Sequence, residues 1–185
     1  FIPAFYRCYG NPQSDHEAVV IARAILRLQY VRAWDLPLTA ETFADCRTYD
    51  EIISRIYRAW AQREGKPRWG DKTPHYVTRI PLLAQSFPDA KFIHIYRDGR
   101  DVARSWIRAR FGPQNVFTAA KDWKARVTAG RQSGRDLPRH RYLEVKYENL
   151  LERPAETMRQ VCLFLDEAYD PAVLQRNLQP GRRRA

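Results

Sequence analysis

The sequence predicts an α/β protein in which a parallel sheet is flanked by helices. Residues 92–96, FIHIY, are nearly all apolar or aromatic and too few for a helix, which is the pattern of a strand buried on both faces. Residues 141–150 alternate well enough to form a second strand, and helical patterns lie before, between and after the two segments. Strands that alternate with helices favour a largely parallel sheet.

Capping signals place the helices of the N-terminal half. The segments Ser14–Glu17 (SDHE) and Thr48–Glu51 (TYDE) both have the form of a capping box, and each precedes apolar residues at helical spacing. We expect the first helix to reach about Trp34 and the second to bury its apolar and aromatic stripe as core. A third helix is predicted over residues 75–86.

Three more helices are predicted after the first strand. One begins near Asp98 or Gly99, one covers about 117–132, and the last starts at Pro154. No repeat or internal linker interrupts the chain, so we expect a single domain over residues 1–185.

The composition limits the classes of function. Among 185 residues, 32 are Lys or Arg and 21 are Asp or Glu, which gives a net charge of +11, and only six of the basic residues are lysine. Arginine suits planar, bidentate anions such as phosphate and sulfate better than lysine does. Three widely spaced cysteines predict neither a disulfide framework nor a zinc site, so a reducing compartment, the cytoplasm, is expected. No apolar run reaches the length of a membrane span.

The junction after the first strand predicts an anion site. Arg97 follows the strand directly, where open α/β sheets hold their ligands, and the start of the next helix offers free N–H groups. Ser105 lies eight residues later, about two helical turns on, and can face the same place. Asp98 and Asp101 are expected as helix caps. The remaining arginines of this stretch are expected mostly on other, solvated helix faces: Arg100, Arg104, Arg108 and Arg110.

Three motifs stand in order along the chain: WGDKTPHY (69–76), YRDGRDVARS (96–105) and VKYENLLERP (145–154). In this order and spacing they resemble the sulfotransferases that use 3′-phosphoadenosine 5′-phosphosulfate (PAPS), most closely the bacterial and carbohydrate-type branches. The resemblance covers residues 69–166. It implies a P-loop-like sulfotransferase fold and the transfer of a sulfuryl group from PAPS to a hydroxyl or amine of a small-molecule or carbohydrate acceptor, without a metal.

The resemblance also implies roles for individual residues. Arg97 and Ser105 match the arginine and serine that bind the 3′-phosphate of the donor. Tyr147 matches a tyrosine that approaches the adenine, although it could equally be a core aromatic. Gly181 and Arg182 resemble a late Gly-Arg loop that closes on the 3′-phosphate, or else form a solvated basic tail.

Two further residues are catalytic candidates by the same resemblance. Lys72 matches a lysine of the substrate cleft that can neutralise charge on the sulfuryl group or its bridging oxygen. The alternative is a solvated lysine before a helix. His75 could accept the proton of the nucleophile, although a histidine at a helix start more often has no such duty.

One family element is absent from the sequence. The Gly/Ser/Thr-rich loop that holds the 5′-phosphosulfate does not occur before Glu17, and the chain begins at Phe1, so we expect an N-terminal segment to be missing. A non-catalytic remnant is therefore one alternative. A basic module that binds nucleic acid or another polyanion is another, but the arginines are dispersed and no nucleic-acid-binding motif appears, so no nucleic-acid partner is expected. A nucleotide kinase would need the same absent loop.

Overall fold

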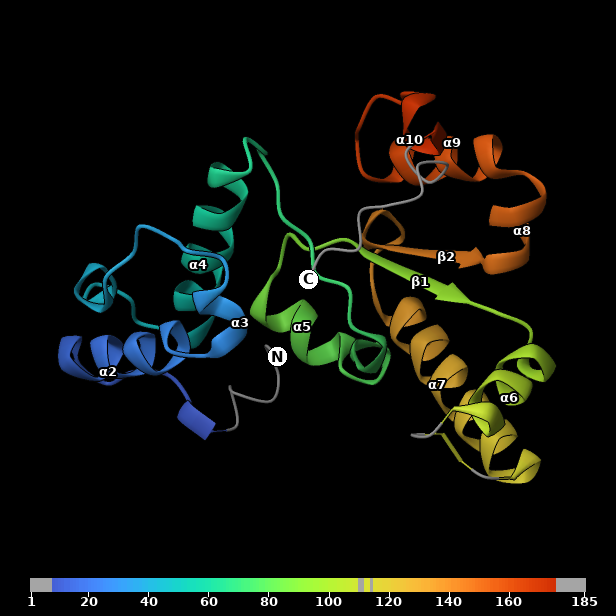
Figure 1. Ribbon diagram of the computed structural model, residues 1–185, viewed down its shortest axis with the longest axis horizontal. Helices are drawn as coiled ribbons and strands as arrows, with labels where there is room; N and C mark the ends of the chain where they lie inside the picture. The colour runs from blue at the N-terminus through green and yellow to red at the C-terminus, as the bar shows by residue number, and fades with distance from the viewer. Residues whose placement is uncertain (1–7, 110–111, 114, 176–185) are drawn as a thin grey trace. The chain divides into compact units, whose positions relative to one another are not determined.

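The computed structural model describes residues 8–109, 112–113 and 115–175 (Figure 1). Arg110, Gly181 and Arg182 lie outside these residues. The chain groups into two compact units, which are described separately: unit 1 holds Phe1–Pro74 and Gln85–Phe87, and unit 2 holds His75–Ala84 and Pro88–Ala185. The single domain expected over residues 1–185 stays a prediction. Among the described helices, none has the length and apolar character needed to cross a membrane.

Unit 1 is helical. Its elements are α2 (Asp15–Leu26), α3 (Gln29–Arg32), the 3₁₀ turn η1 (Ala40–Phe43) and α4 (Tyr49–Arg63). The core lies where α2 and η1 meet the inner face of α4, and includes the fully buried side chains of Ile25, Phe43, Ile52 and Ile56. The predicted extension of the first helix to Trp34 is wrong. Leu28 is extended, with ψ of 132°, so one helix ends before it and α3 starts after it.

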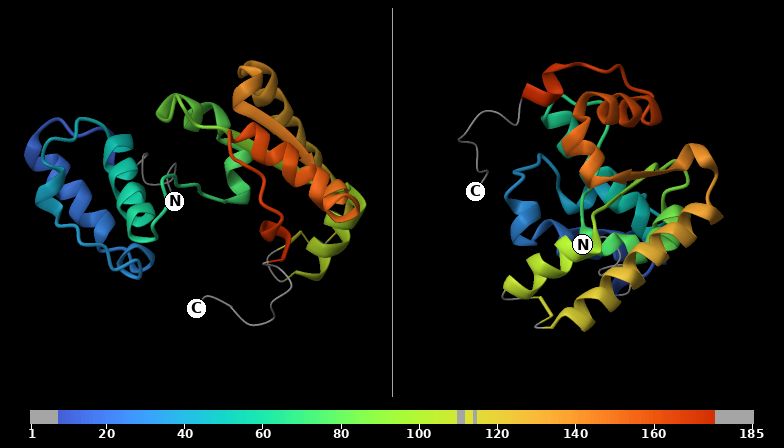
Figure 2. Two further views of the ribbon diagram at one scale, coloured as in Figure 1. Left: turned by 90° about the horizontal axis from the view of Figure 1, so that it is seen from above. Right: turned by 90° about the vertical axis from the view of Figure 1, so that its right-hand side faces the viewer.

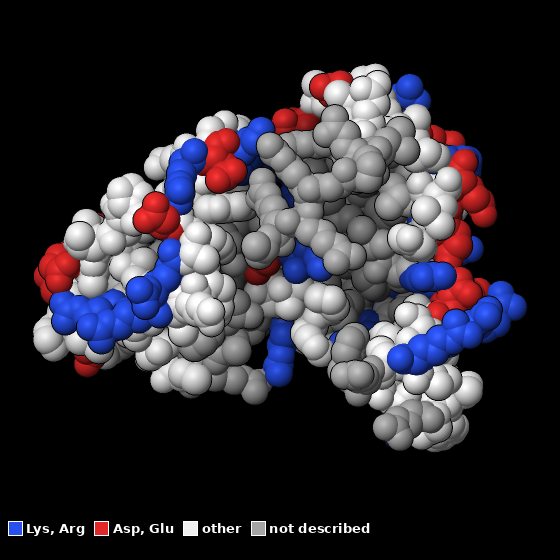
Figure 3. Space-filling view, viewed as in Figure 1, with Lys and Arg blue, Asp and Glu red and all other residues white. Residues whose placement is uncertain are grey.

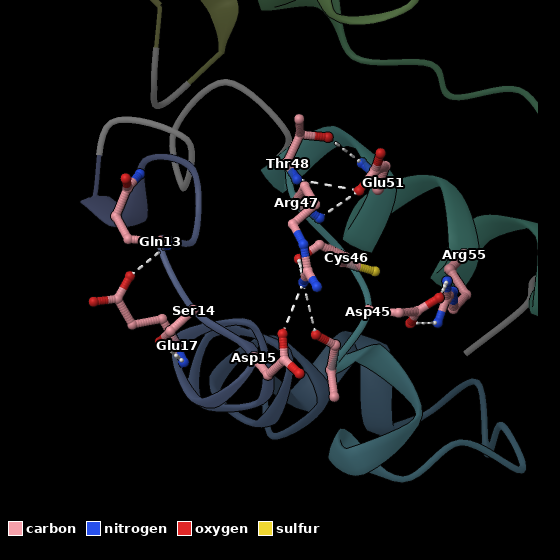
Figure 4. A network of polar contacts seen from close by, with 11 residues as sticks. Gln13, Ser14, Asp15, Glu17, Asp45, Cys46, Arg47, Thr48, Glu51 and Arg55 are labelled. Atoms are coloured by element: carbon pink, nitrogen blue, oxygen red, sulfur yellow. Dashed lines mark hydrogen bonds and ion pairs between the residues drawn. The ribbon is translucent and has the colours of Figure 1, made fainter.

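Both predicted caps of unit 1 are present (Figure 4). Thr48 accepts a hydrogen bond from the Glu51 backbone N–H, and the Glu51 carboxylate accepts one from the Thr48 N–H, so this capping box is complete. At α2, Ser14 accepts from the Glu17 N–H, while the Glu17 carboxylate accepts from the Gln13 N–H, one residue earlier than a capping box requires. These bonds satisfy N–H groups that a helix start leaves unpaired.

Unit 2 contains the sheet (Figure 1). Its strands are β1 (Phe92–Tyr96) and β2 (Tyr142–Lys146), which pair in parallel from Phe92 opposite Tyr142 to Tyr96 opposite Lys146. The predicted parallel pairing is confirmed. Between and after the strands the chain forms α6 (Gly99–Arg108), α7 (Val116–Asp136), the 3₁₀ turn η3 (Arg139–Arg141), α8 (Tyr147–Glu152), α9 (Pro154–Phe164) and α10 (Ala172–Gln175).

Helix α7 packs on one face of the sheet, as the views of Figure 2 also show. Two glycines allow this close approach, because a Cβ on Gly130 would lie 2.5 Å from the His94 ring and one on Gly134 would lie 2.2 Å from the Tyr142 ring. The other face is only partly covered: Val145 is buried, but Ile95 is 55% exposed. Burial of β1 on both faces was therefore a wrong expectation. Helix α9 packs beside β2, and the described sheet has no strand on the far side of β1.

Two other expected elements also differ in the structure. The predicted helix over 75–86 is a 3₁₀ turn, η2 (Pro74–Thr78), followed by α5 (Ile80–Ser86), whose second residue is Pro81. Proline is favoured in a first helical turn because the N–H it lacks would be unpaired there. The predicted strand over 141–150 ends at Lys146, since Tyr147 already begins α8.

Candidate functional site

The site begins at the turn that joins β1 to α6. Asp98 caps the helix, because its carboxylate accepts a hydrogen bond of 2.9 Å from the Arg100 backbone N–H. The same carboxylate is bound by the Arg100 guanidinium at 2.9 Å. The hydrogen bonds from Arg100, those of the side chain first, lower the pKa of Asp98 to about 2. The Arg100 side chain is otherwise 92% exposed to solvent.

One face of α6 carries the candidate side chains of the site. Residues three, four and seven positions apart share a helix face, and this spacing groups Asp101 with Arg104, Ser105 and Arg108. Together with Arg97 from the end of β1, these residues line an open cavity of about 330 Å³. We call it the arginine cavity. Arg97 and Ser105 therefore line the same cavity.

Arg104 and Arg108 do not lie on separate faces, which corrects the expectation from the sequence. The spacing from Asp101 was the signal that could have shown it.

The cavity holds three guanidinium groups and one carboxylate. Asp101 binds Arg97 at 2.8 Å, and this hydrogen bond is the main cause that raises the pKa of Arg97. Within the described part of the chain, no ion pair is recorded for Arg104 or Arg108, so the cavity has an excess of positive charge that favours an anion.

Tyr147 lies beside this cavity because of the parallel pairing. Tyr96 and Lys146 are the last paired residues of the two strands, so Arg97 and Tyr147 leave the sheet at the same edge. The Arg97 guanidinium carbon lies 5.2 Å from the centroid of the Tyr147 ring, within range of a cation–π contact. The structure thus brings together three residues that the sequence singled out, Arg97, Ser105 and Tyr147.

Two residues that sequence reasoning missed contact the turn itself. The indole N–H of Trp123, on α7, donates a hydrogen bond of 2.9 Å to the Arg97 carbonyl. The Glu148 carboxylate, on α8, accepts one of 2.9 Å from the Asp98 backbone N–H, and this bond is the main cause that lowers the pKa of Glu148. Trp123 carries no sequence signal for this contact, since it lies 26 residues from Arg97.

Lys72 belongs to unit 1, whereas the residues of the arginine cavity belong to unit 2. Its loop is anchored on α4: the Trp69 ring stacks on Tyr57 with centroids 4.5 Å apart, and the Tyr57 hydroxyl donates to the Asp71 carboxylate at 3.2 Å. The Phe87 ring meets the Trp69 ring edge-on, with the two centroids 5.7 Å apart. Lys72 itself is exposed. The aromatic packing and the hydrogen bond to Asp71 therefore hold the backbone just before Lys72 and leave the ammonium group accessible.

His75 is exposed and lies against α7. A guanidinium N–H of Arg126 is 3.2 Å from His75 Nδ1. Arginine can only donate, so Nδ1 accepts, and in the neutral ring the hydrogen is on Nε2. In this arrangement the ring has no free lone pair with which to accept a proton. Among the described residues, no group of three or more His, Cys, Asp and Glu side chains is placed to hold a metal ion.

The sequence matches the profile of the sulfotransferase family over residues 2–171. A protein-tyrosine sulfotransferase of Drosophila melanogaster is 30% identical over 116 residues, which are 60% of this chain and 23% of that protein. A putative protein-tyrosine sulfotransferase of Caenorhabditis elegans is 26% identical over 145 residues, which are 75% of this chain and 53% of that protein. The chain spans about half the length of these relatives, or less.

Solved structures show the same fold. A sulfotransferase domain from the curacin biosynthetic pathway superposes with a TM-score of 0.61 at 19% identity, over 94% of this chain and 63% of that domain. A sulfotransferase domain from the Synechococcus PCC 7002 olefin synthase also reaches 0.61, at 24% identity, over 94% and 62%. The predicted α/β fold of the sulfotransferase type is confirmed. Because the family profile also covers residues 2–171, the chain belongs to the sulfotransferase family.

Proposed function

We propose that the arginine cavity binds the 3′-phosphate of PAPS, and that the protein acts in the transfer of a sulfuryl group from this donor to an acceptor. The observation that carries the proposal is that Arg97 and Ser105 line one cavity in which three arginines face a single aspartate. Guanidinium groups and a hydroxyl are donors that suit a phosphate dianion. The cavity lies at the end of parallel strands, where open α/β sheets hold their ligands.

The proposal gives each residue of the cavity a separate task. Arg97 forms the charge-assisted contact with the 3′-phosphate, and Ser105 donates its hydroxyl. Tyr147, whose ring already contacts Arg97, offers an aromatic surface beside the phosphate for the adenine. The contact proposed for Gly181 and Arg182 rests on the resemblance of the GRRR segment alone.

Catalysis in this proposal relies on positioning and charge stabilisation. PAPS supplies the sulfuryl group when it is bound. The exposed ammonium of Lys72 would stabilise charge that develops on the sulfuryl group or its bridging oxygen. His75 could accept a proton only after its contact with Arg126 opens.

The acceptor in the proposal is a hydroxyl or an amine. The resemblance favoured a small molecule or a carbohydrate, whereas the curated relatives are protein-tyrosine sulfotransferases, so a tyrosine of a peptide is an equal choice. Turnover of labelled PAPS with a tyrosine peptide, a simple phenol and an oligosaccharide would separate these acceptors. The cytoplasm remains the proposed compartment; its support is that the three cysteines are odd in number and widely spaced, which predicts no disulfide framework.

Calorimetric titration with 3′-phosphoadenosine 5′-phosphate (PAP), the product of the donor, tests the proposal. We expect Arg97→Ala to weaken PAP binding on the order of 10- to 100-fold, and Ser105→Ala to weaken it less. Arg100→Ala is the matched control, because Arg100 lies on the same helix but outside the cavity. Adenosine 5′-phosphate (AMP) lacks the 3′ group and should bind wild type and Arg97→Ala alike.

Two results would contradict the proposal. One is equal PAP affinity of Arg97→Ala and Arg100→Ala. The other is binding that falls steeply with salt and does not distinguish PAP from AMP, which would indicate a general polyanion surface. On the face drawn in Figure 3, acidic side chains lie among the basic ones in each unit, which does not favour such a surface.

A further inference from the structure

We propose that Trp123 and Glu148 are positioning residues that set the direction in which Arg97 and Ser105 meet the donor phosphate. The inference rests on the proposed function, because it concerns the same cavity. Neither residue lines the arginine cavity. Both act on the backbone that joins its two sides.

The two hydrogen bonds hold one and the same peptide group. The carbonyl of Arg97 and the N–H of Asp98 belong to a single peptide unit, which is planar. The oxygen accepts from the Trp123 indole at 2.9 Å, and the nitrogen donates to the Glu148 carboxylate at 2.9 Å. One bond comes from α7 and the other from α8, so this peptide plane is held from two helices at once.

Rotation of this peptide would change the cavity. Arg97 ends β1, and Asp98, on the other side of the peptide, is the N-cap that starts α6. Ser105 and Arg108 lie on α6, so the orientation of the Arg97–Asp98 peptide sets how their helix face meets the Arg97 side chain. Each residue has only two freely rotating backbone dihedral angles, so few angles connect the end of β1 to the start of α6. A bond at each end of the plane therefore restrains the angle at which the two sides of the cavity meet.

Gly99 makes the indole contact possible. A Cβ at this position would lie 2.8 Å from Cδ2 of Trp123, closer than real contacts allow. The first residue of α6 must therefore lack a side chain for the Trp123 ring to lie against the helix start. Substitution by alanine would displace the indole while it favours helix formation, because alanine has the higher helix propensity.

The partial burial of the Glu148 carboxylate also supports its role in holding the Arg97–Asp98 peptide. Its Oε1 accepts the bond from Asp98, while its Oε2 is buried and finds no hydrogen-bond partner among the described residues. A half-buried carboxylate with one unpaired oxygen is costly to keep. The bond from the Asp98 N–H ties this carboxylate to the turn, beside a hydrogen bond from the backbone of Glu148 itself.

The test measures the contribution of the 3′-phosphate separately from the rest of the ligand. The ratio of the dissociation constants of AMP and PAP, determined by calorimetry on the intact protein, is the readout. Trp123→Phe removes the indole N–H, and Glu148→Ala removes the acceptor. We expect each to lower the ratio about 3- to 10-fold while AMP affinity stays unchanged. Glu148→Gln, which keeps an acceptor oxygen, should retain most of the wild-type ratio, and Gly99→Ala, which displaces the indole, should lower it.

Matched controls exist for both variants. Trp106→Phe removes an indole N–H from α6 itself, and Glu152→Ala removes a carboxylate from α8. Among the described residues, the side chains that hydrogen-bond to the Arg97–Asp98 peptide are Trp123 and Glu148, not these two. Both control variants should keep the wild-type ratio. In an Arg97→Ala background, Trp123→Phe should have no further effect on the ratio if it acts through Arg97.

Three results would contradict the inference, and the two dissociation constants distinguish them from one another. A wild-type ratio in Trp123→Phe and Glu148→Ala, together with a lowered ratio in Arg97→Ala, would overturn the positioning role and leave the proposed function intact. Equal weakening of AMP and PAP would show that the two residues only support the fold, which also overturns the inference. A wild-type ratio in Arg97→Ala would refute the proposed phosphate site and, with it, this inference.

Discussion

The guanidinium carbon of Arg97 lies 5.2 Å from the centroid of the Tyr147 ring, so the first residue after β1 contacts the first residue after β2. The contact follows from the register of the two strands, which end together at one edge of the sheet. It predicts that Tyr147 contributes to anion binding through its ring and not through its hydroxyl.

Substitution of Tyr147 tests this reading of the contact. Tyr147→Phe should keep PAP affinity within about twofold, because the cation–π contact needs only the ring. Tyr147→Leu should weaken PAP about 2- to 5-fold, since an exposed cation–π contact contributes about that much. Calorimetry with PAP measures both. A loss in Tyr147→Phe as large as that in Tyr147→Leu would assign the effect to the hydroxyl instead.

Arg108 should bind the donor although it is not part of the strand–helix junction. It lines the arginine cavity one helical turn beyond Ser105, and no acidic partner is recorded for it within the described residues. We expect Arg108→Ala to weaken PAP about 3- to 10-fold. It should not lower the thermal stability of the ligand-free protein, because it removes one of three like charges. Arg100→Ala is the control; similar PAP affinity in both variants would place Arg108 outside the phosphate site.

Lys72 should affect the rate more than the affinity for the donor. A cationic group that acts on developing charge contributes mainly in the transition state, and loss of one such group typically lowers the rate about 100- to 1,000-fold. Lys72→Ala should therefore lower kcat by about this factor and leave PAP affinity nearly unchanged. Lys66→Ala, in the exposed turn that precedes Trp69, is the matched control. Wild-type kcat in Lys72→Ala would make Lys72 a solvated lysine.

His75 should contribute little to the rate, because its Nδ1 already accepts a hydrogen bond from Arg126. Loss of a general base typically lowers the rate about 100- to 10,000-fold. We expect His75→Ala to lower kcat less than about 10-fold and to leave the pH profile of kcat unchanged. A larger loss, together with a missing acidic limb of that profile, would instead identify His75 as the base and require its contact with Arg126 to open during turnover.

The sequence predicted those parts of the fold that are decided by residues close together in the chain. The caps at Ser14, Thr48 and Asp98 were predictable because a side-chain oxygen and an N–H two or three residues later decide them. The exposure of Ile95 was not predictable, since it depends on which elements cover the second face of the sheet. The apolar pattern of residues 92–96 indicates a strand, but it does not show which elements cover each face of that strand.

The residues of the candidate site likewise fall into those that a local pattern predicts and those that depend on contacts between distant parts of the chain. Arg97 and Ser105 lie within one strand–helix unit, so their spacing was enough to place them together. The spacing of Arg104 and Arg108 from Asp101 and Ser105 was also visible, so their place on the same face of α6 could have been predicted. Trp123 reaches the Arg97 carbonyl only through the packing of α7 on α6, a contact between distant parts of the chain that no local pattern encodes.

His94 should make the stability of unit 2 depend on pH. Its ring is buried between β1 and α7, and a hydrogen bond of 2.7 Å joins Nδ1 to the Tyr142 hydroxyl. Burial is the main cause that lowers the pKa of His94 below its usual 6.5; Glu144 opposes this shift and Arg131 adds to it. The unfolded chain therefore binds the proton more readily than the folded one.

The sign of the effect follows from this difference. The contribution of neutral His94 to stability is complete above about pH 6.5 and is lost as the pH falls from there through the lower folded-state pKa. We expect the unfolding free energy, measured by urea titration, to decrease from pH 7 to pH 5 in the wild type. His94→Asn cannot titrate and should show a smaller decrease over this range, whatever its absolute stability. His140→Asn, in the exposed turn η3, serves as the control and should behave as the wild type. An NMR titration that placed the His94 midpoint at or above 6.5 would contradict the prediction directly, because the folded protein would then lose no stability when this ring is protonated.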